Sequence, residues 1–316
     1  LGSNERCEVL ASLANGRVDV VVGTHALLEP EVMFANLGFV VVDEQQRFGV
    51  EQRARLSAKG RDACPDVLVM SATPIPRTLA LTAYGDLRLT VIDELPPGRQ
   101  PAETRVVDAM QIEEVYRELE GEIACSRQAY VVCPRIDAVD GGAASAALET
   151  ARHLRARFPS RNVALLHGRM TGEECRATME QFRRGAIDVL VSTTIIEVGI
   201  DVPNASFMVI VDAEKLGLAQ LHQLRGRVGR GAIRGKCRVV ASADSPVARE
   251  RLRVLEETDD GFVVAERDLA LEVGLLDGGV QLAPPELQAL DLLTHLGQVE
   301  VRAGPAAAVF LPVEAE

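Results

Sequence analysis

The sequence predicts an α/β fold in which two parallel-sheet domains follow one another along the chain. The first observation behind this prediction is a series of short apolar runs, rich in β-branched residues, that end in polar residues and alternate with helical stretches. Runs of this kind are typical of parallel strands that are covered by helices on both faces. They lie at residues 18–24, 39–44, 67–73, 129–134, 163–167, 187–193 and 207–212.

The second observation is an internal repeat. Residues 16–24 read GRVDVVVGT, and residues 185–193 read GAIDVLVST. Each string predicts a glycine turn, a buried strand and a hydroxyl at the end of the strand. We therefore expect two copies of one α/β domain, with chance similarity between two buried strands as the alternative. Between them, ELPPGRQP at 94–101 predicts a stiff linker.

These features divide the chain into three parts. We predict a partial first domain at residues 1–100, a second domain at 101–245 and a divergent acidic C-terminal tail at 246–316. The tail is acidic because residues 254–316 hold 13 acidic and 2 basic side chains. The net charge of −12 therefore does not exclude a nucleic-acid partner, since local charge decides where a phosphate backbone binds. Residues 152–185 and 222–238 are basic, and a solvated arginine-rich face is the alternative.

Composition excludes several classes of protein. The six cysteines are scattered without a CxxC pair, which argues against a zinc site or a disulfide framework and favours a reducing cytoplasm. No apolar run approaches the roughly 20 residues that cross a bilayer, so we expect no membrane association. Aromatic residues make up 3% of the chain and tryptophan is absent, which argues against extensive stacking on nucleic-acid bases.

A pair of carboxylates follows one of the predicted strands. FVVV at residues 39–42 leads directly into Asp43 and Glu44. Burying two carboxylates costs several kcal/mol unless a cation or hydrogen bonds compensate. In ATPases that transfer phosphoryl groups the cation is Mg²⁺, so we predict that Asp43 holds the metal and Glu44 polarises the attacking water. A simple helix cap is the alternative.

A Gln/Gly/Arg string is the most specific pattern in the chain. Residues 220–231 read QLHQLRGRVGRG, which sets Gln223, Arg227 and Arg230 in register. Gly226 and Gly229 permit close approach of the backbone. The planar fork of arginine grips phosphate oxygens bidentately, so the string predicts arginines that stabilise phosphate charge. A plain basic helix is the alternative.

Hydroxyl side chains stand at three predicted strand ends. They occur in SATPIPRT at 71–78, in GTHALL at 23–28 and in STT at 192–194. Each can be a helix N-cap, but their repetition on comparable strands predicts a surface that follows phosphates. The string EVGIDVP at 197–203 then predicts that Asp201 lies near the cleft between the domains.

Taken together, these strings resemble the motifs of superfamily 2 helicases. Motif II corresponds to residues 43–46, motif III to 71–73, motif V to 193–203 and motif VI to 220–230. Longer strings are similar to the RecG type of helicase and, less closely, to the transcription-repair coupling factor. They are SATPIPRTLALTAYGD at 71–86, IDELPPGR at 92–99 and RFGVEQR at 47–53, and the similarity runs from residue 1 to about residue 271.

The resemblance implies two tandem RecA-like domains, the first truncated at its N-terminus, that use ATP and Mg²⁺ to translocate on duplex DNA. The implied partner is branched double-stranded DNA at stalled forks and Holliday junctions, and we expect a monomer in the cytoplasm. The implied site residues are Asp43, Glu44, Arg227 and Arg230 for catalysis, with Asp43 on the metal; Gln223, Gly199 and Asp201 for ATP binding; Gln46, Ser71 and Thr73 for coupling; and Thr24, His25, Arg77 and Thr194 for DNA binding.

The sequence departs from the family pattern in three places. It contains no Gly-x-x-x-x-Gly-Lys-[Ser/Thr] phosphate loop, so we expect the chain to begin after that loop and after the family's wedge domain, and to be inactive alone. Gln46 stands where the family usually has histidine, and beyond residue 271 an acidic stretch replaces the family's expected sequence. Two alternatives stay open: an ATPase-deficient DNA-binding or regulatory fragment, and an unrelated nucleotide-binding α/β enzyme.

Overall fold

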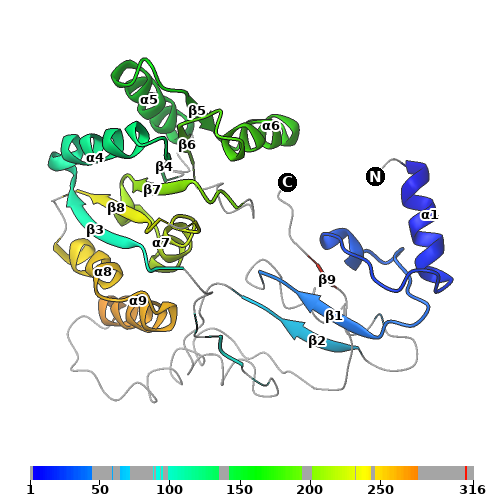
Figure 1. Ribbon diagram of the computed structural model, residues 1–316. Helices are drawn as coiled ribbons and strands as arrows, with labels where there is room; N and C mark the ends of the chain where they lie inside the picture. The colour runs from blue at the N-terminus through cyan, green and yellow to red at the C-terminus, as the bar shows by residue number, and fades with distance from the viewer. Residues whose placement is uncertain are drawn as a thin grey trace. The chain divides into compact units, whose positions relative to one another are not determined.

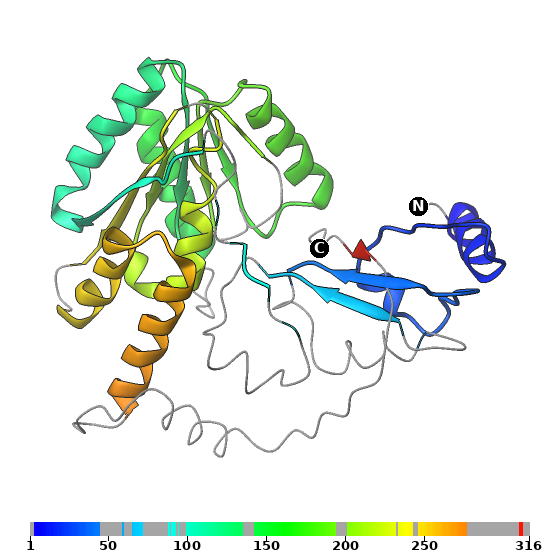
Figure 2. The same ribbon diagram turned by 60° about the horizontal axis from the view of Figure 1, so that its bottom comes forward.

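Contacts divide the chain into two compact units, Leu1–Thr73 with Pro285–Glu316 and Pro74–Pro284. Both units are drawn in Figure 1 and Figure 2, and each is described by itself. The computed structural model describes residues 3–44, 59, 65–71, 88, 90–92, 94, 99–134, 142–193, 201–231, 233–242, 246–276 and 310–311.

The larger unit is built on a six-stranded sheet in the order β3-β8-β7-β4-β6-β5. All five strand pairings in it are parallel, as predicted. The strands are β3 Glu103–Asp108, β4 Gln128–Val132, β5 Val163–Leu166, β6 Val189–Ser192, β7 Ala205–Ile210 and β8 Lys236–Ala241. The helices are η3 Ala109–Gln111, α4 Ile112–Ala124, α5 Gly142–Arg157, α6 Gly172–Arg183, η5 Ala213–Lys215, α7 Leu218–Arg225, α8 Pro246–Glu257 and α9 Gly261–Leu276.

Helices cover both faces of this sheet (Figure 2). Successive residues of a strand point to opposite faces, and the residues of β4 divide accordingly between two cores. Ala129 and Val131 pack in one core with residues of α4 and α5. Tyr130 and Val132 pack in the other with residues of α6, α7, α8 and α9. Every residue of β4, β6 and β7 is buried, so the prediction of strands covered on both faces is confirmed for these three strands. In β5, Ala164 and Leu165 are half-buried.

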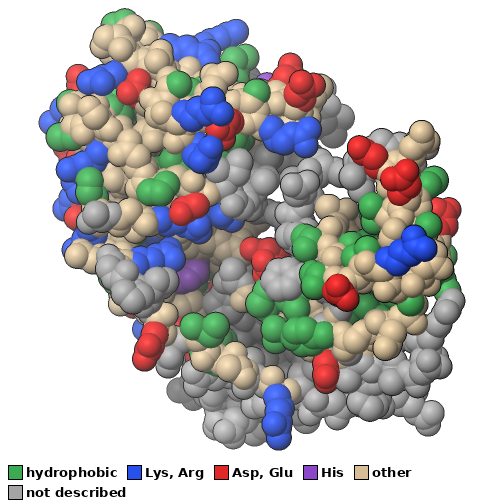
Figure 3. Space-filling view, turned by 45° about the vertical axis from the view of Figure 1, so that its right-hand side comes forward, with side chains coloured by type: hydrophobic (Ala, Val, Ile, Leu, Met, Phe, Trp, Pro, Cys, Tyr) green, Lys and Arg blue, Asp and Glu red, His purple; other side chains and the backbone are tan. Residues whose placement is uncertain are grey.

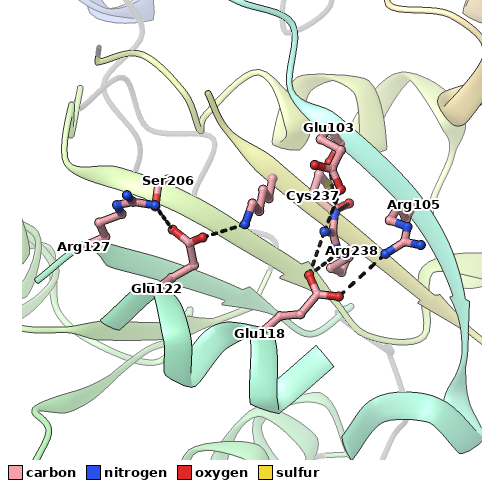
Figure 4. A network of polar contacts seen from close by, with 9 residues as sticks. Glu103, Arg105, Glu118, Glu122, Arg127, Ser206, Cys237 and Arg238 are labelled. Atoms are coloured by element: carbon pink, nitrogen blue, oxygen red, sulfur yellow. Dashed lines mark hydrogen bonds and ion pairs between the residues drawn. The ribbon is translucent and has the colours of Figure 1, made fainter. Parts of the chain in front are cut away.

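Two strands of the sheet, β3 and β8, were not predicted because their sequences, ETRVVD and KCRVVA, carry charges. The cations of β8 are neutralised on the face that α4 covers (Figure 4), whereas Asp108 of β3 pairs with Arg249 of α8 at 2.8 Å. Lys236 Nζ lies 2.9 Å from Glu122 Oε1, and Arg238 Nη2 lies 2.7 Å from Glu118 Oε2. Residues two apart on a strand share a face, as do residues four apart on a helix. The Lys236 and Arg238 side chains of β8 therefore lie opposite Glu122 and Glu118 of α4.

The smaller unit contains a three-stranded sheet in the order β2-β1-β9, and both of its strand pairings are parallel. Its core packs Val40 and Val42 against Leu13, Leu28 and neighbouring residues. The elements are α1 Ser3–Ala14, η1 His25–Leu28, β1 Phe39–Val42, β2 Asp66–Val69 and β9 Phe310–Leu311.

The predicted strand at residues 18–24 is wrong. Within that run only Val22 forms an isolated β-bridge, and the side chains of Val20 and Val22 are 75% and 59% exposed. Val18 and Val21 instead pack on the small core, so the run is partly buried without forming a continuous strand. The glycine turns of the repeat are confirmed, because Gly16 and Gly185 have φ of +67° and +78°.

Burial on both faces, as predicted for the first domain, is also wrong for the strands of the smaller unit. Phe39 at the start of β1 is 54% exposed, and Val67 and Leu68 of β2 are 38% and 46% exposed. Figure 3 shows hydrophobic side chains on the surface of this unit. The described helices α1 and η1 pack on Val40 and Val42 and leave these other side chains uncovered.

Residues 246–276, placed by the sequence in a divergent tail, form α8 and α9. Val254 and Leu255 of α8 and Val264 of α9 are buried in the core that also holds α6 and α7. Glu256 of α8 accepts a hydrogen bond from the backbone N–H of Val106 in β3 at 2.6 Å. In the described part of the chain, no helix has the length and apolar character to span a bilayer.

Candidate nucleotide-binding residues

The two predicted catalytic carboxylates follow β1 directly. Val42 ends the strand, and Asp43 and Glu44 are partly buried. Asp43 Oδ1 accepts a hydrogen bond of 2.9 Å from the backbone N–H of Glu44. Glu44 adopts a φ of +51°, in the left-handed region that costs a non-glycine residue on the order of 1 kcal/mol or more. The chain therefore turns sharply at the end of the strand.

This strand end fits a divalent cation held by oxygen atoms. The hydrogen bond from Glu44 uses one carboxylate oxygen of Asp43, and Oδ2 has no hydrogen-bond partner among the described residues. Mg²⁺ is commonly held by one or two carboxylates together with water and phosphate oxygens. The described residues include no group of three or more His, Cys, Asp and Glu side chains that could bind a metal by themselves.

Ser71 lies at the same edge of the sheet as Asp43. The backbone N–H of Met70 donates to the carbonyl of Val42 at 2.7 Å, which extends the pairing of β1 with β2 by one residue. Ser71 is the next residue and is exposed. The predicted motif II and motif III residues therefore emerge side by side from neighbouring strands.

Thr24 and His25 lie at the start of η1. Thr24 is the N-cap, and its hydroxyl accepts a hydrogen bond from the backbone N–H of Ala26 at 3.4 Å. The capping alternative from the sequence is thus realised at this position, and a role in DNA binding stays a prediction. Five predicted site residues lie outside the described residues: Gln46, Thr73, Arg77, Thr194 and Gly199.

In the larger unit, the predicted arginines stand in the turn that follows α7. Gln223 lies in the helix, and Arg227 and Arg230 follow its C-terminus. Arg230 Nε donates to the carbonyl of Gly226 at 3.0 Å, and its Nη1 lies 3.5 Å from Asp201 Oδ1. The structure therefore brings Asp201 and Arg230 together.

The pKa of the buried phenol of Tyr130, on β4, is affected by the charges of these same residues. Burial raises its pKa to about 12, while the positive charges of Arg227 and Arg230 act to lower it. The Asp201 carboxylate acts in the opposite direction. The arginine turn, residues 226–231, is also bonded to the sheet, because the backbone N–H of Gly229 donates to the carbonyl of Ala205 in β7 at 3.2 Å.

Glycines allow this turn to fold back on itself. Gly229 has a φ of +71°, and a Cβ atom there would lie 2.6 Å from the backbone nitrogen of Gly235. A Cβ at Gly231 would lie 2.5 Å from the carbonyl oxygen of Pro203. The close backbone approach that the sequence predicted for Gly229 is therefore present, and its partner is the chain itself.

Helix α7 is held at both ends by the pair α8–α9. At its N-terminus the backbone N–H of Leu218 donates to Asp268 Oδ2 of α9 at 3.1 Å. At its C-terminus Arg225, 4% exposed, donates through Nη1 to the carbonyls of Leu255 and Thr258 at 2.7 and 3.0 Å. These contacts fix the helix that leads into the arginine turn.

The basic segment 222–238 is only partly available to phosphates, which corrects the sequence-based interpretation. Arg225 and Arg238 are buried and bind protein groups, and Lys236 pairs with Glu122. Arg234 Nε donates to the carbonyl of Pro101 at 2.9 Å. The segment is therefore in large part a structural element.

His222 gives the larger unit a pH-dependent stability. Its Nδ1 lies 2.9 Å from Arg225 Nη2, and because arginine can only donate, the ring must accept and stay neutral. Burial first, and the charge of Arg225 second, lower the pKa of His222 from 6.5 to about 4. Between these two pH values, His222 is protonated in the unfolded chain and neutral in the folded chain. Stability is complete above pH 6.5 and is lost as the pH falls towards 4.

We expect the lost stability to reach about 3 kcal/mol, the size of a pKa shift of this magnitude. The measurement is urea unfolding of the chain and of a His222→Asn variant between pH 7 and pH 4, because asparagine keeps an acceptor without titrating. The unfolding free energy of the unsubstituted chain should fall relative to that of His222→Asn as the pH decreases from 7 to 4. The matched control is His153→Asn at an exposed position. An unchanged difference for His222→Asn would contradict the assignment.

Comparisons with known proteins agree with this arrangement. Residues 1–82 match the family model described as DEAD/DEAH box helicase, and residues 110–232 match the helicase conserved C-terminal domain. The ATP-dependent DNA helicase RecG of Synechocystis sp. is 50% identical over 268 residues, which cover 84% of this chain and 32% of the relative. RecG of Bacillus subtilis is 44% identical and aligns with 96% of this chain and 44% of its own length.

Solved structures give the same result. A structure of RecG bound to a three-way DNA junction is 46% identical, with a TM-score of 0.68, and the match covers 85% of this chain and 35% of that one. The RNA-bound Dbp5 L327V of S. cerevisiae, 16% identical with a TM-score of 0.52, shares the fold. The chain thus spans between 32% and 44% of the length of these curated relatives. With its two parallel-sheet units and these matches, the chain belongs to the RecG type of superfamily 2 helicases.

Proposed function

We propose that this chain supplies the motor of an ATP-dependent DNA helicase. The observation that carries the proposal is the turn after α7, where Arg230 is held between the Gly226 carbonyl and Asp201. Its ion pair with Asp201 is long, at 3.5 Å, and its side chain remains 30% exposed. A guanidinium held in this way can exchange its protein partners for phosphate oxygens, which it binds bidentately.

The proposed chemistry assigns roles to both units. Bound Mg²⁺ would neutralise charge on the phosphates. Asp43 would hold that ion through its carboxylate, and Glu44 would orient and polarise the attacking water. Arg227 and Arg230 would donate charge-assisted hydrogen bonds to phosphate oxygens as negative charge develops on them. The proposed supporting residues are Gln223, Gly199 and Asp201 for ATP binding and Gln46, Ser71 and Thr73 for coupling.

The proposed substrate is branched double-stranded DNA. Relatives of the chain are named ATP-dependent DNA helicase RecG, and one is bound to a three-way DNA junction. We extend this to remodelling of stalled forks and Holliday junctions in recombination and repair. The proposed DNA contacts are Thr24, His25, Arg77 and Thr194. Action as a monomer remains a prediction.

We also propose the organisation and the compartment. The motor comprises a first domain at residues 1–100, a second at 101–245 and a C-terminal segment at 246–316. The boundary near residue 100 rests on the Pro/Gly-rich linker in the sequence. The cytoplasm is the proposed compartment, supported by the free thiols of Cys7, Cys125, Cys133, Cys175 and Cys237.

The test compares ATP turnover by two polypeptides. The first is the 316-residue chain, in which no Gly-x-x-x-x-Gly-Lys-[Ser/Thr] string is present to cradle the phosphates. The second, called here the joined polypeptide, carries ahead of Leu1 the part of Synechocystis RecG that precedes its matched region. We expect negligible turnover by the first and DNA-stimulated turnover by the second.

The DNA substrates are a three-way junction and a linear duplex of equal length, and circular dichroism checks folding of both polypeptides. Greater stimulation by the junction is the expected result. Rapid turnover by the 316-residue chain alone would overturn its proposed inactivity. A folded joined polypeptide that does not hydrolyse ATP with either DNA would overturn the motor assignment.

A further inference from the structure

The segment that leads into β3, residues 99–103, makes three hydrogen bonds to residues 226–235. Arg99 Nη2 donates to the carbonyl of Gly226 at 2.9 Å. Arg234 Nε donates to the carbonyl of Pro101 at 2.9 Å, and the backbone N–H of Glu103 donates to the carbonyl of Gly235 at 2.7 Å. Residues 99–103 therefore run along residues 226–235, and Arg99 is the point of attachment nearest to Arg230.

Arg99 and Arg230 share one acceptor. The carbonyl of Gly226 receives Arg99 Nη2 at 2.9 Å and Arg230 Nε at 3.0 Å. Gly226 is the C-cap of α7, where the final carbonyls lack donors within the helix and favour positive charge. A carbonyl oxygen has two lone pairs and can accept both hydrogen bonds. If one arginine leaves, the other can still satisfy the helix end.

The two guanidiniums also repel each other. Burial first, and the positive charge of Arg230 second, lower the pKa of Arg99, while the Asp201 carboxylate acts to raise it. Asp201 is the carboxylate that pairs with Arg230, at 3.5 Å. An anion that draws Arg230 away from Gly226 would therefore relieve repulsion without leaving the carbonyl unpaired.

We propose that Arg99 is a positioning residue for Arg230. Because Arg99 donates a hydrogen bond to the Gly226 carbonyl, Arg230 can leave that carbonyl and bind a phosphate. This inference rests on the proposed function of Arg230. It assigns a task in the nucleotide site to a residue of the linker sequence, 127 positions away from Gly226 in the chain. The ligand class is a polyphosphate anion.

The test follows Arg230 directly in the full 316-residue chain. Nitrogen-15 spectra of the arginine Nε–H groups are recorded, and the Arg230 signal is identified by its loss in Arg230→Lys. Inorganic tripolyphosphate is the probe and is titrated at low salt into the unsubstituted chain, Arg99→Gln, Arg99→Lys and the control Arg117→Gln. Arg117 is a 67% exposed residue of α4 that pairs with Glu114, so its loss removes one charge away from the turn.

We expect tripolyphosphate to move the Arg230 signal of the unsubstituted chain. Arg99→Gln should weaken the binding of tripolyphosphate about tenfold, because Arg230 would leave the Gly226 carbonyl without a hydrogen bond when it moves to the ligand. A tenfold change corresponds to the free energy of about one hydrogen bond to a charged group. Arg99→Lys should be intermediate, because the charge remains but the fork is lost. Arg117→Gln should resemble the unsubstituted chain. Without ligand, the Arg230 Nε proton should exchange with solvent more slowly in Arg99→Gln. Arg230 no longer shares the Gly226 carbonyl with Arg99 in this variant, so its own hydrogen bond should open less often.

The possible failures are distinguishable. If the Arg230 signal responds equally in the unsubstituted chain and in Arg99→Gln, the positioning role is wrong and the role of Arg230 stands. Equal losses in Arg99→Gln and Arg117→Gln would reduce the effect to net charge and would also overturn the inference. If tripolyphosphate does not move the Arg230 signal in the unsubstituted chain, both the inference and the proposed phosphate contact of Arg230 are wrong.

Discussion

Replacing Arg238 with methionine is expected to lower the free energy of unfolding of the larger unit by about 3 kcal/mol. Arg238 is 2% exposed and pairs through Nη2 with Glu103 and Glu118 at 2.8 and 2.7 Å. Methionine fills much of the same volume but leaves both carboxylates without their buried partner. They are 40% and 35% exposed, which places the loss at the lower end of the range for broken buried pairs.

Thermal unfolding measures this loss, and a midpoint about 6 to 12 °C lower is expected for a unit of this size. Arg105→Met is the matched control, because Arg105 lies on β3 and approaches the same Glu118 carboxylate at 3.9 Å while 62% exposed. Exposed pairs contribute roughly 0 to 1 kcal/mol. Equal losses for the two variants would show that burial of Arg238 does not determine its contribution.

Replacing Arg230 with lysine is expected to reduce ATP turnover by the joined polypeptide about a thousandfold or more, the range measured for arginine fingers. Lysine keeps the charge but cannot make two parallel hydrogen bonds to one phosphate group. It also cannot reproduce the geometry in which Arg230 Nε meets Gly226 while Nη1 approaches Asp201. Turnover is measured at saturating ATP and DNA, so that the chemical step is compared.

Arg117→Lys is the control for this variant. Arg117 lies on α4, is 67% exposed and pairs with Glu114 at 3.9 Å, and it has no proposed contact with ATP. Its substitution should leave turnover unchanged. A similar loss in both variants would mean that the loss in Arg230→Lys does not depend on the position of Arg230 in the turn.

The central strands could be predicted from the sequence because burial on both faces leaves an unbroken apolar run. FMVI at 207–210 and VLV at 189–191 are such runs, and both are strands of the larger sheet. The strands β3 and β8 were not predicted because charged residues interrupt their apolar runs, Arg105 in β3 and Arg238 in β8. Their charges are tolerated through carboxylates on α4, and no local pattern in the sequence reports contacts between such distant residues.

The failure at residues 18–24 has a different physical cause. The run resembles β6 residue by residue, yet Val20 and Val22 are exposed. A strand is stabilised by hydrogen bonds to a neighbouring strand, and this part of the chain makes only the isolated bridge at Val22. Apolar composition indicates that a segment can pair, whereas the pairing partner decides whether it does.

The candidate site was predicted where its residues are close in sequence. Fixed spacing identified Gln223, Arg227 and Arg230, and a strand followed by two acids identified Asp43 and Glu44. Arg99 was missed because its significance depends on the carbonyl of Gly226, which carries no signature in a sequence. A tertiary hydrogen bond to the backbone becomes visible only in the fold.

This account depends on our proposal that the acidic pair, Asp43 and Glu44, and the arginines, Arg227 and Arg230, contribute to the same step of ATP hydrolysis. The most direct test is ATP turnover by the joined polypeptide carrying Glu44→Gln, Arg230→Lys or both substitutions. Groups that act together in one chemical step lose activity non-additively. We expect each single variant to be severely impaired and the double variant to be scarcely slower than the slower single variant. Independent losses that multiply in the double variant, or full activity in Glu44→Gln, would contradict the claim.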